Sequence, residues 1–182
     1  MIAPMSQQVT PGEFFKSRIR EVPDFPKPGI NFYDITTLLR DPAGFKAAIE
    51  CLSAPFADAG IDIVVGIESR GFILGGAVAD RLSAGFCPIR KPGKLPARTL
   101  RESFSLEYGT DSIEIHTDAI QPGQRVLVVD DVLATGGTAK AASALVKGLG
   151  GTLHGLAFLI ELDFLKGRNQ LQGEHVTSVL HY

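Results

Sequence analysis

A short apolar run followed by two acidic residues and a glycine-rich loop is the feature that most constrains this chain. Four apolar residues at 126–129 precede Asp130 and Asp131, and the chain continues as Val132, Leu133, Ala134, Thr135, Gly136, Gly137 and Thr138. In open α/β sheets, ligands collect at the carboxyl ends of the strands. Glycines let backbone N–H groups approach an oxyanion, and a following helix adds favourable partial charge. The segment therefore predicts a phosphate site, with two carboxylates beside it for sugar hydroxyls.

The competing interpretation of so short a motif is an acidic turn with a glycine-rich helix cap. The preceding strand and the paired aspartates favour the phosphate site. The loop lacks the Gly-Lys-Ser/Thr of a Walker loop, and its glycines are wrongly spaced for a dinucleotide fingerprint. A polyol that carries one phosphate is the ligand class that fits.

The remaining hydrophobic pattern predicts alternating strands and helices. Apolar runs at 61–67, 86–89, 126–129, 153–162 and 176–180 indicate strands. Helices are expected at about 72–82 and 138–149, and further helices begin near Pro11 and Pro42. The segment 90–116 predicts a loop and an antiparallel ribbon with one exposed face. Strand, helix and strand in succession indicate a mostly parallel sheet flanked by helices.

Composition excludes several classes of function. The 182 residues are 45% hydrophobic with a formal net charge of -2, which suits one domain and argues against a nucleic-acid surface. Cys51 and Cys87 lie in no metal-binding spacing. The chain has no secretory signal pattern and no apolar run long enough to span a membrane, so a cytoplasmic protein is expected.

Four ordered blocks resemble a known family. Residues 126–138 resemble the donor-binding signature of the type I purine phosphoribosyltransferases, and residues 23–36 resemble the base-binding hood of their adenine-specific members. Residues 68–72 resemble the pyrophosphate loop, and residues 90–96 with 105–109 resemble the mobile catalytic loop. The resemblance implies a single domain over 1–182, with a hood at about 22–40, a mobile antiparallel loop at about 91–115, and a homodimer.

The resemblance also implies a reaction. Ribose 5-phosphate would pass from 5-phospho-α-D-ribose 1-diphosphate, the donor, to adenine and give AMP and diphosphate, as in purine salvage. Mg²⁺ would be held mainly by the donor and by waters, with Asp130 as the protein group considered for direct contact. The 5-phosphate would lie on Ala134, Thr135, Gly136, Gly137 and Thr138, and the ribose on Asp130 and Asp131.

Further roles follow from the same resemblance. The catalytic residues would be Glu107, Arg70 and Lys94, with Glu107 as the general acid that shares a proton with the purine N7. The pyrophosphate would be held by Glu68, Ser69, Arg70, Arg90, Lys91 and Lys94. Tyr108 would assist loop closure, and the base would contact Ile30, Asn31 and Phe32. The alternative interpretation of Arg70 is a surface salt bridge. Without the resemblance, the basic cluster and Glu107 are expected to be solvated, and Phe32 is expected to be a core residue.

Two positions depart from the family pattern. Many relatives carry an apolar residue in place of Asn31 and an arginine in place of Tyr33, which leaves the purine selectivity open. A phosphoribosyltransferase for another base therefore stays an alternative. A donor-sensing regulator of the same fold and a sugar-phosphate binding module without chemistry are the other two.

Overall fold

The computed structural model describes residues 11–106 and 109–182. The chain divides into two compact units, residues 1–48 and residues 49–182. The smaller unit holds α1 (Pro11–Lys16), β1 (Arg20–Pro23), β2 (Asn31–Asp34) and α2 (Thr36–Arg40). The helix α3 (Pro42–Ser53) begins at the predicted proline and runs across the boundary between the units. The prediction of one domain over the whole chain stays a prediction.

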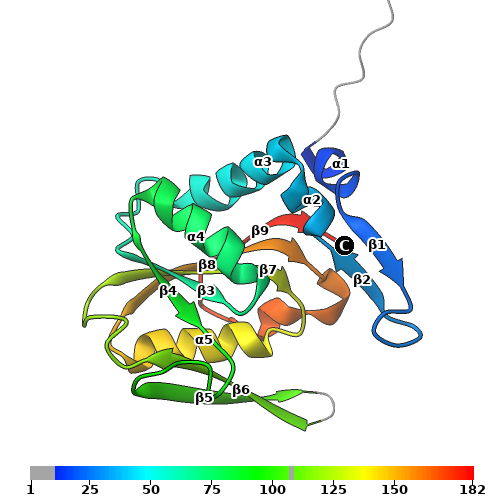
Figure 1. The fold of residues 1–182 in the computed structure, drawn as a ribbon. Helices are drawn as coiled ribbons and strands as arrows, with labels where there is room; N and C mark the ends of the chain where they lie inside the picture. Colours follow the sequence, from blue (N-terminus) through cyan, green and yellow to red (C-terminus); the bar gives the residue numbers. More distant parts are fainter. Residues whose placement is uncertain (1–10, 107–108) are drawn as a thin grey trace, which may run out of the picture. The chain divides into compact units, whose positions relative to one another are not determined.

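A parallel sheet in the order β4-β3-β7-β8-β9 forms the centre of the larger unit. Its strands are β3 (Ile63–Ile67), β4 (Gly85–Ile89), β7 (Arg125–Leu133), β8 (Thr152–Glu161) and β9 (Val176–His181). Figure 1 shows α4 (Arg70–Leu82) on one face of this sheet and α5 (Gly137–Gly148) on the other. The predicted α/β fold class, a mostly parallel sheet flanked by helices, is confirmed.

The strands are buried on both faces because helices cover both. Val126, Leu127, Val128 and Val129 of β7 have no exposed surface, and seven consecutive residues of β8, 155–161, are buried. Such unbroken apolar runs are typical of parallel strands. Within the described part of the chain, no helix has the length and apolar character needed to cross a membrane.

An antiparallel ribbon lies beside α5 in Figure 1 and consists of β5 (Thr99–Leu106) and β6 (Gly109–His116). Thr99 pairs with His116 at its base, and the partly buried Leu100 and Phe104 pack against the core. The predicted ribbon is therefore present. Within the ribbon, Glu114 of β6 is an acidic residue that is buried. Its carboxylate pairs with Arg101 at 2.6 Å, which compensates for the lost hydration.

The strand β7 is longer than the sequence predicts. It continues past Val129 to Leu133, because Asp130 and Val132 still pair with Phe158 and Ile160 of β8. The two aspartates therefore lie in the last part of the strand and not in a loop after it. Three short 3-10 helices complete the unit, η1 (Ala54–Phe56), η2 (Asp163–Leu165) and η3 (Gly167–Gln170).

Candidate active site

Three segments predicted to bind the donor lie at one edge of the sheet, because β3, β4 and β7 are parallel neighbours. The end of β3 leads into Glu68, Ser69 and Arg70, and the end of β4 leads into Arg90. The chain leaves β3 toward α4 on one face of the sheet and leaves β7 toward α5 on the other face. The direction of the connections therefore changes between β3 and β7. Ligands in open α/β sheets bind at such a switch point.

A small cavity of ≈ 70 Å³ follows β7 and is formed by the predicted phosphate loop. Its lining includes all five predicted 5-phosphate residues together with Asp130, and these five are Ala134, Thr135, Gly136, Gly137 and Thr138. Gly136 has φ +86°, a conformation that glycine adopts without strain, and it turns the chain into α5. The backbone N–H groups at this helix start have no intrahelical acceptor, so the cavity suits an anion.

The start of α4 packs directly on the aspartates of β7. A Cβ atom at Gly71 would lie 2.8 Å from Oδ1 of Asp130 and 3.0 Å from the carbonyl oxygen of Val129. A side chain at this position would therefore force the Asp130 carboxylate or the start of α4 to shift. The close packing places Arg70 beside Asp131, and the Arg70 Nε donates a hydrogen bond to the Asp131 carboxylate. The predicted pyrophosphate loop and the predicted ribose carboxylates are thus in contact.

The two aspartates differ in their surroundings. The Asp131 side chain is 8% exposed and forms an ion pair with Arg70. Burial raises the pKa of Asp130 well above its usual value, and the neighbouring charge of Asp131 raises it further. The backbone N–H of Asp131 donates to Oδ1 of Asp130 at 2.8 Å and partly offsets this effect. Asp130 is therefore a carboxyl group whose ionisation a nearby cation would favour.

The predicted basic cluster is tied to carboxylates. Arg90 pairs with Glu68 at 3.2 Å, and the backbone N–H of Lys91 donates to the same Glu68 carboxylate at 3.0 Å. These bonds, led by that of Lys91, lower the pKa of Glu68. The Lys91 side chain pairs with Asp111, and the Lys94 carbonyl accepts a hydrogen bond from Arg90 at 3.2 Å. The structure thus brings Glu68, Arg90, Lys91 and Lys94 together.

Sequence reasoning missed the acidic partner of Lys91 on the ribbon. Asp111 lies 20 positions further along the chain, and only the folded ribbon brings it close. The hydrogen bond from Lys91 lowers the pKa of Asp111, so this carboxylate is charged at neutral pH. No sequence motif marks this pairing. The signal available was the alternation of the ribbon, which does not reveal the register against residues 90–94.

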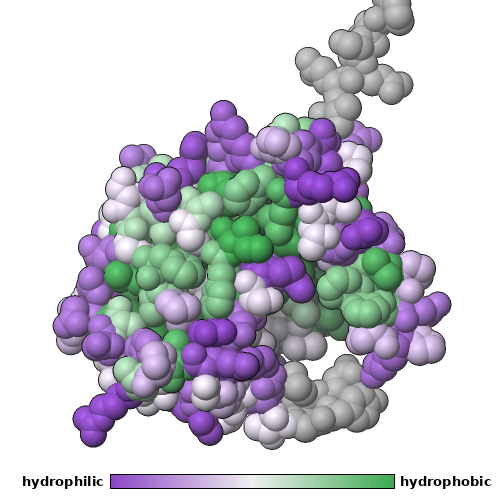
Figure 2. Space-filling view, in the orientation of Figure 1, coloured by the Kyte–Doolittle hydropathy of each residue, from purple (hydrophilic) through white to green (hydrophobic). Residues whose placement is uncertain are grey.

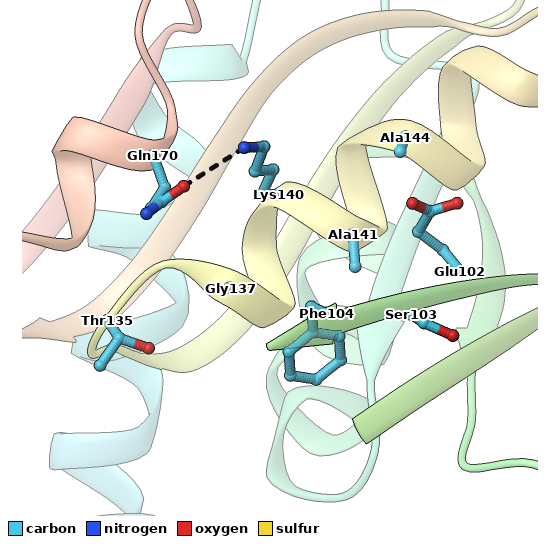
Figure 3. A pocket seen from close by; sticks show the side chains of 9 residues that line it. All are labelled: Glu102, Ser103, Phe104, Thr135, Gly137, Lys140, Ala141, Ala144 and Gln170. Atoms are coloured by element: carbon cyan, nitrogen blue, oxygen red, sulfur yellow. Dashed lines mark hydrogen bonds between the residues drawn. The ribbon is translucent and has the colours of Figure 1, made fainter. Parts of the chain in front are cut away.

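A larger cavity of ≈ 430 Å³ lies between the ribbon and α5 and also escaped prediction. Figure 3 shows that Thr135 and Gly137 of the phosphate loop lie at one end of it, and Phe104 of β5 lies across from α5. The Lys140 Nζ donates a hydrogen bond to Oε1 of Gln170 at 3.3 Å, which joins α5 to η3. The cavity therefore opens next to the predicted 5-phosphate position.

In the smaller unit, the β1–β2 hairpin forms a groove of ≈ 600 Å³. Phe32 lines it and meets Phe25 edge to face, with ring centroids 5.3 Å apart. Ile30 and Asn31 are exposed and are not among the lining residues, and the Asn31 side chain donates to Glu21 at 3.0 Å. Of the three residues predicted to contact the base, the groove thus contains Phe32. Glu107 and Tyr108 lie outside the described residues.

Comparison with known proteins identifies the family. The model of the phosphoribosyl transferase domain matches residues 34–178. An adenine phosphoribosyltransferase of Acidobacterium capsulatum is 60% identical over 170 residues, which cover 93% of this chain and 94% of the relative. The chain belongs to the adenine phosphoribosyltransferase family. The family predicted from the four sequence blocks, and the pentosyltransferase class that it implies, are confirmed.

Solved structures agree with this membership. The adenine phosphoribosyltransferase of Rhodothermus marinus is 57% identical with a TM-score of 0.92, and the match covers 96% of this chain and 100% of that one. The enzyme of Saccharomyces cerevisiae, solved with an imino-altritol bisphosphate and adenine, is 40% identical with a TM-score of 0.88, over 93% and 98% of the two chains. The adenine phosphoribosyltransferase fold therefore extends over nearly the whole chain.

Proposed function

We propose that this chain transfers the 5-phosphoribosyl group of 5-phospho-α-D-ribose 1-diphosphate to N9 of adenine. The bond from C1 of the ribose to the diphosphate oxygen breaks, the bond from C1 to N9 forms, and diphosphate leaves with the electron pair of the broken bond. Adenine gives up one proton in this direction, which Glu107 would accept from N7 and would return in the reverse reaction. The observation that carries the proposal is the cavity formed by residues 134–138 with Asp130 beside it, in a chain 60% identical to an adenine phosphoribosyltransferase. A phosphate on one side and sugar hydroxyls on the other fit this pair of features.

The donor would bind across the edge of the sheet. Its 5-phosphate would accept hydrogen bonds from the backbone N–H groups of 134–138, and its ribose hydroxyls would donate to Asp130 and Asp131. Since the sugar centre gains positive charge as the diphosphate leaves, nearby carboxylates also favour that step electrostatically. The diphosphate would take hydrogen bonds from Arg70 and from the backbone after β3, at Glu68 and Ser69.

The basic cluster would clamp the diphosphate, with Arg90 and Lys91 close to the sheet and Lys94 reaching it from its turn. The Lys91 side chain would release Asp111 and bind the diphosphate instead. Exposed ion pairs contribute only about 0 to 1 kcal/mol, so this exchange costs little.

Magnesium is the cofactor that we propose. It is a hard cation that prefers oxygen ligands and keeps several waters, and donor oxygens would supply most of its other ligands. The half-buried Asp130 carboxyl lines the phosphate cavity and offers such an oxygen. Its raised pKa means that a cation at this position would favour its ionised form. Bound magnesium would neutralise charge on the leaving diphosphate.

The base would enter against Phe32, whose ring lies in the groove of the hairpin. An aromatic ring binds a flat purine by stacking. Ile30 and Asn31 would contribute through backbone groups. Glu107 would share a proton with N7 of the purine, and Tyr108 would help the loop exclude water. These roles of Glu107 and Tyr108 rest on the family resemblance.

A homodimer is also part of the proposal. Ile73 of α4 is 48% exposed and Phe86 of β4 is 40% exposed, and Figure 2 shows apolar surface over these two elements. An exposed apolar surface at the edge of a sheet is typical of a subunit interface. Ile73→Glu should give a monomer in size-exclusion chromatography with light scattering, whereas Phe164→Glu, at a separate exposed phenylalanine, should leave the dimer intact.

The two cysteines are unpaired, which fits a reducing compartment, and the cytoplasm is the location that we propose.

The deciding experiment for the reaction is a base-selectivity assay. Purified protein with donor and Mg²⁺ should make AMP and diphosphate from adenine and leave hypoxanthine unchanged. Glu107→Gln should slow the reaction by about 100-fold, in the range of lost general acid catalysis, and Glu50→Gln on α3 serves as the matched control. Turnover of another base in place of adenine would overturn the adenine assignment, and turnover of no base would overturn the enzyme.

A further inference from the structure

The short helix η3 packs directly against the phosphate loop, residues 134–138. A Cβ atom at Gly167 would overlap the carbonyl oxygen of Ala134 and lie 3.1 Å from the backbone nitrogen of Gly136. In the other direction, a Cβ atom at Gly136 would overlap the carbonyl oxygen of Gly167. The two backbones are therefore in contact, and any movement of η3 away from the sheet would remove the support behind residues 134–136.

An ion pair between a buried carboxylate and a partly exposed arginine holds η3 in this position. Glu161 stands at the end of β8 with its side chain 5% exposed. The Arg168 guanidinium donates to its two carboxylate oxygens at 2.7 and 2.8 Å, and the Ser178 hydroxyl donates at 2.6 Å. Arg168 also donates to the carbonyl oxygen of Val176 at 3.0 Å. One side chain thus joins η3 to both β8 and β9.

The geometry of this pair is specific. A bidentate contact of an arginine with a carboxylate fixes the orientation of both groups. Burial alone would raise the pKa of Glu161, but the hydrogen bonds from Arg168 and Ser178 outweigh that effect and lower it. The carboxylate is therefore charged at neutral pH. The Lys140–Gln170 hydrogen bond also ties η3 to α5 (Figure 3).

We propose that Arg168 and Glu161 are positioning residues that hold the phosphate loop in its binding geometry through η3. Neither residue is among those that line the phosphate cavity, so neither touches the 5-phosphate directly. The inference rests on the proposed function, in which residues 134–138 bind the 5-phosphate of the donor. It adds a specific role for an ion pair about 30 residues further along the chain than the loop it supports.

Ribose 5-phosphate is the probe that tests the inference without turnover. Calorimetry should show that Arg168→Lys and Glu161→Gln bind it about 10 to 100 times more weakly than the unmodified chain, since a displacement of about 1 Å at a site has effects of that size. Arg168→Lys keeps the charge but loses the planar two-pronged contact. In steady-state assays the KM for the donor should rise by a similar factor while the KM for adenine stays unchanged. Arg81→Lys, on the surface of α4, is the matched control.

A second variant tests the same contact without altering the ion pair. Gly167→Ala should push on the carbonyl of Ala134 and weaken ribose 5-phosphate binding to a similar extent, whereas Gly76→Ala, which has open space around it, should not. This variant decides the matter if the ion-pair variants do not fold.

The outcomes separate the two claims. If the unmodified chain does not bind ribose 5-phosphate, the proposed function of the loop is wrong, and the inference fails with it. If it binds, but the folded variants of Arg168, Glu161 and Gly167 bind equally well, only the inference is overturned. Reduced thermal stability with unchanged affinity and unchanged KM for the donor would indicate a purely structural ion pair and would also overturn it.

Discussion

Substituting Gly71 with alanine tests whether the packing of α4 against β7 sets the geometry for donor binding. A Cβ atom there would lie 2.8 Å from Oδ1 of Asp130, whereas ordinary contact begins at 3.4 Å. The carboxylate or the start of α4 must therefore move by about 0.6 Å, the difference between the two distances. The carboxylate cannot turn away freely, because it accepts the backbone N–H of Asp131 at 2.8 Å. The backbone of Val129, at 3.0 Å, blocks the other direction.

The expected result is a loss of donor use without unfolding. A misplacement of this size should lower kcat/KM for the donor by about 10- to 100-fold. Circular dichroism should show a folded protein, since alanine is a better helix former than glycine by about 1 kcal/mol, which offsets part of the strain. Steady-state kinetics with varied donor at saturating adenine would measure the effect.

Gly76→Ala is the matched control for this experiment, because it lies on the same helix and a Cβ atom added there would have nothing within 4 Å. It should leave the kinetics unchanged and raise the free energy of unfolding by about 0.4 to 1 kcal/mol. If Gly71→Ala keeps the donor kinetics of the unmodified chain, the close contact does not set the position of Asp130, and the reasoning is refuted.

Three further predictions follow from the titratable groups. Asp130→Asn should abolish most turnover yet raise the free energy of unfolding at neutral pH. The pKa of Asp130 is raised in the folded chain, so the unmodified chain loses stability as the pH rises through that pKa. Thermal melts at several pH values should show that this loss is absent in the variant. Hydrogen bonds from Thr36 lower the pKa of Asp34 to about 2, so Asp34→Asn should lower the free energy of unfolding at pH 7 by about 1 to 2 kcal/mol in denaturant unfolding. The unmodified chain should lose this stability as the pH falls from 3.8 to about 2, and the variant should not show that loss. Burial raises the pKa of the Cys87 thiol to about 11, so a thiol reagent at pH 8 should label the exposed Cys51 first, and equal labelling rates would contradict the packing of β4.

The sheet and its phosphate loop could be predicted because their signals are local. Unbroken apolar runs bounded by turn residues mark the parallel strands, and the glycines after β7 mark a tight approach of backbone to ligand. The end of β7 could not be predicted, because strand pairing with β8 continues through Asp130 and Val132 against any local preference of aspartate. Propensity describes a residue alone, whereas the register of two strands decides where pairing stops.

The supporting contacts of the site were also beyond sequence reasoning. The cavity between the ribbon and α5 and the packing of Gly167 on Ala134 join segments that are far apart in the chain. Gly167 has no turn motif that would mark it, since its reason for being glycine is the backbone that faces it. Such requirements are visible only where two loops of the folded chain meet.

The carboxylates around the basic cluster explain how so many cations can share one edge of the sheet. The pairs are Arg70 with Asp131, Arg90 with Glu68, and Lys91 with Asp111. Cations gathered for a diphosphate repel one another, and the acidic partners of Arg70, Arg90 and Lys91 reduce that repulsion and limit the rotamers of these long side chains. A diphosphate offers several acceptor oxygens, so charge-assisted hydrogen bonds can replace the exposed ion pairs at little net cost. The Arg70–Asp131 pair is the exception, because Asp131 is nearly buried and would be left without its cation. Ribose hydroxyls that donate to Asp131 would compensate for that loss, which couples binding of the sugar to release of Arg70 toward the diphosphate.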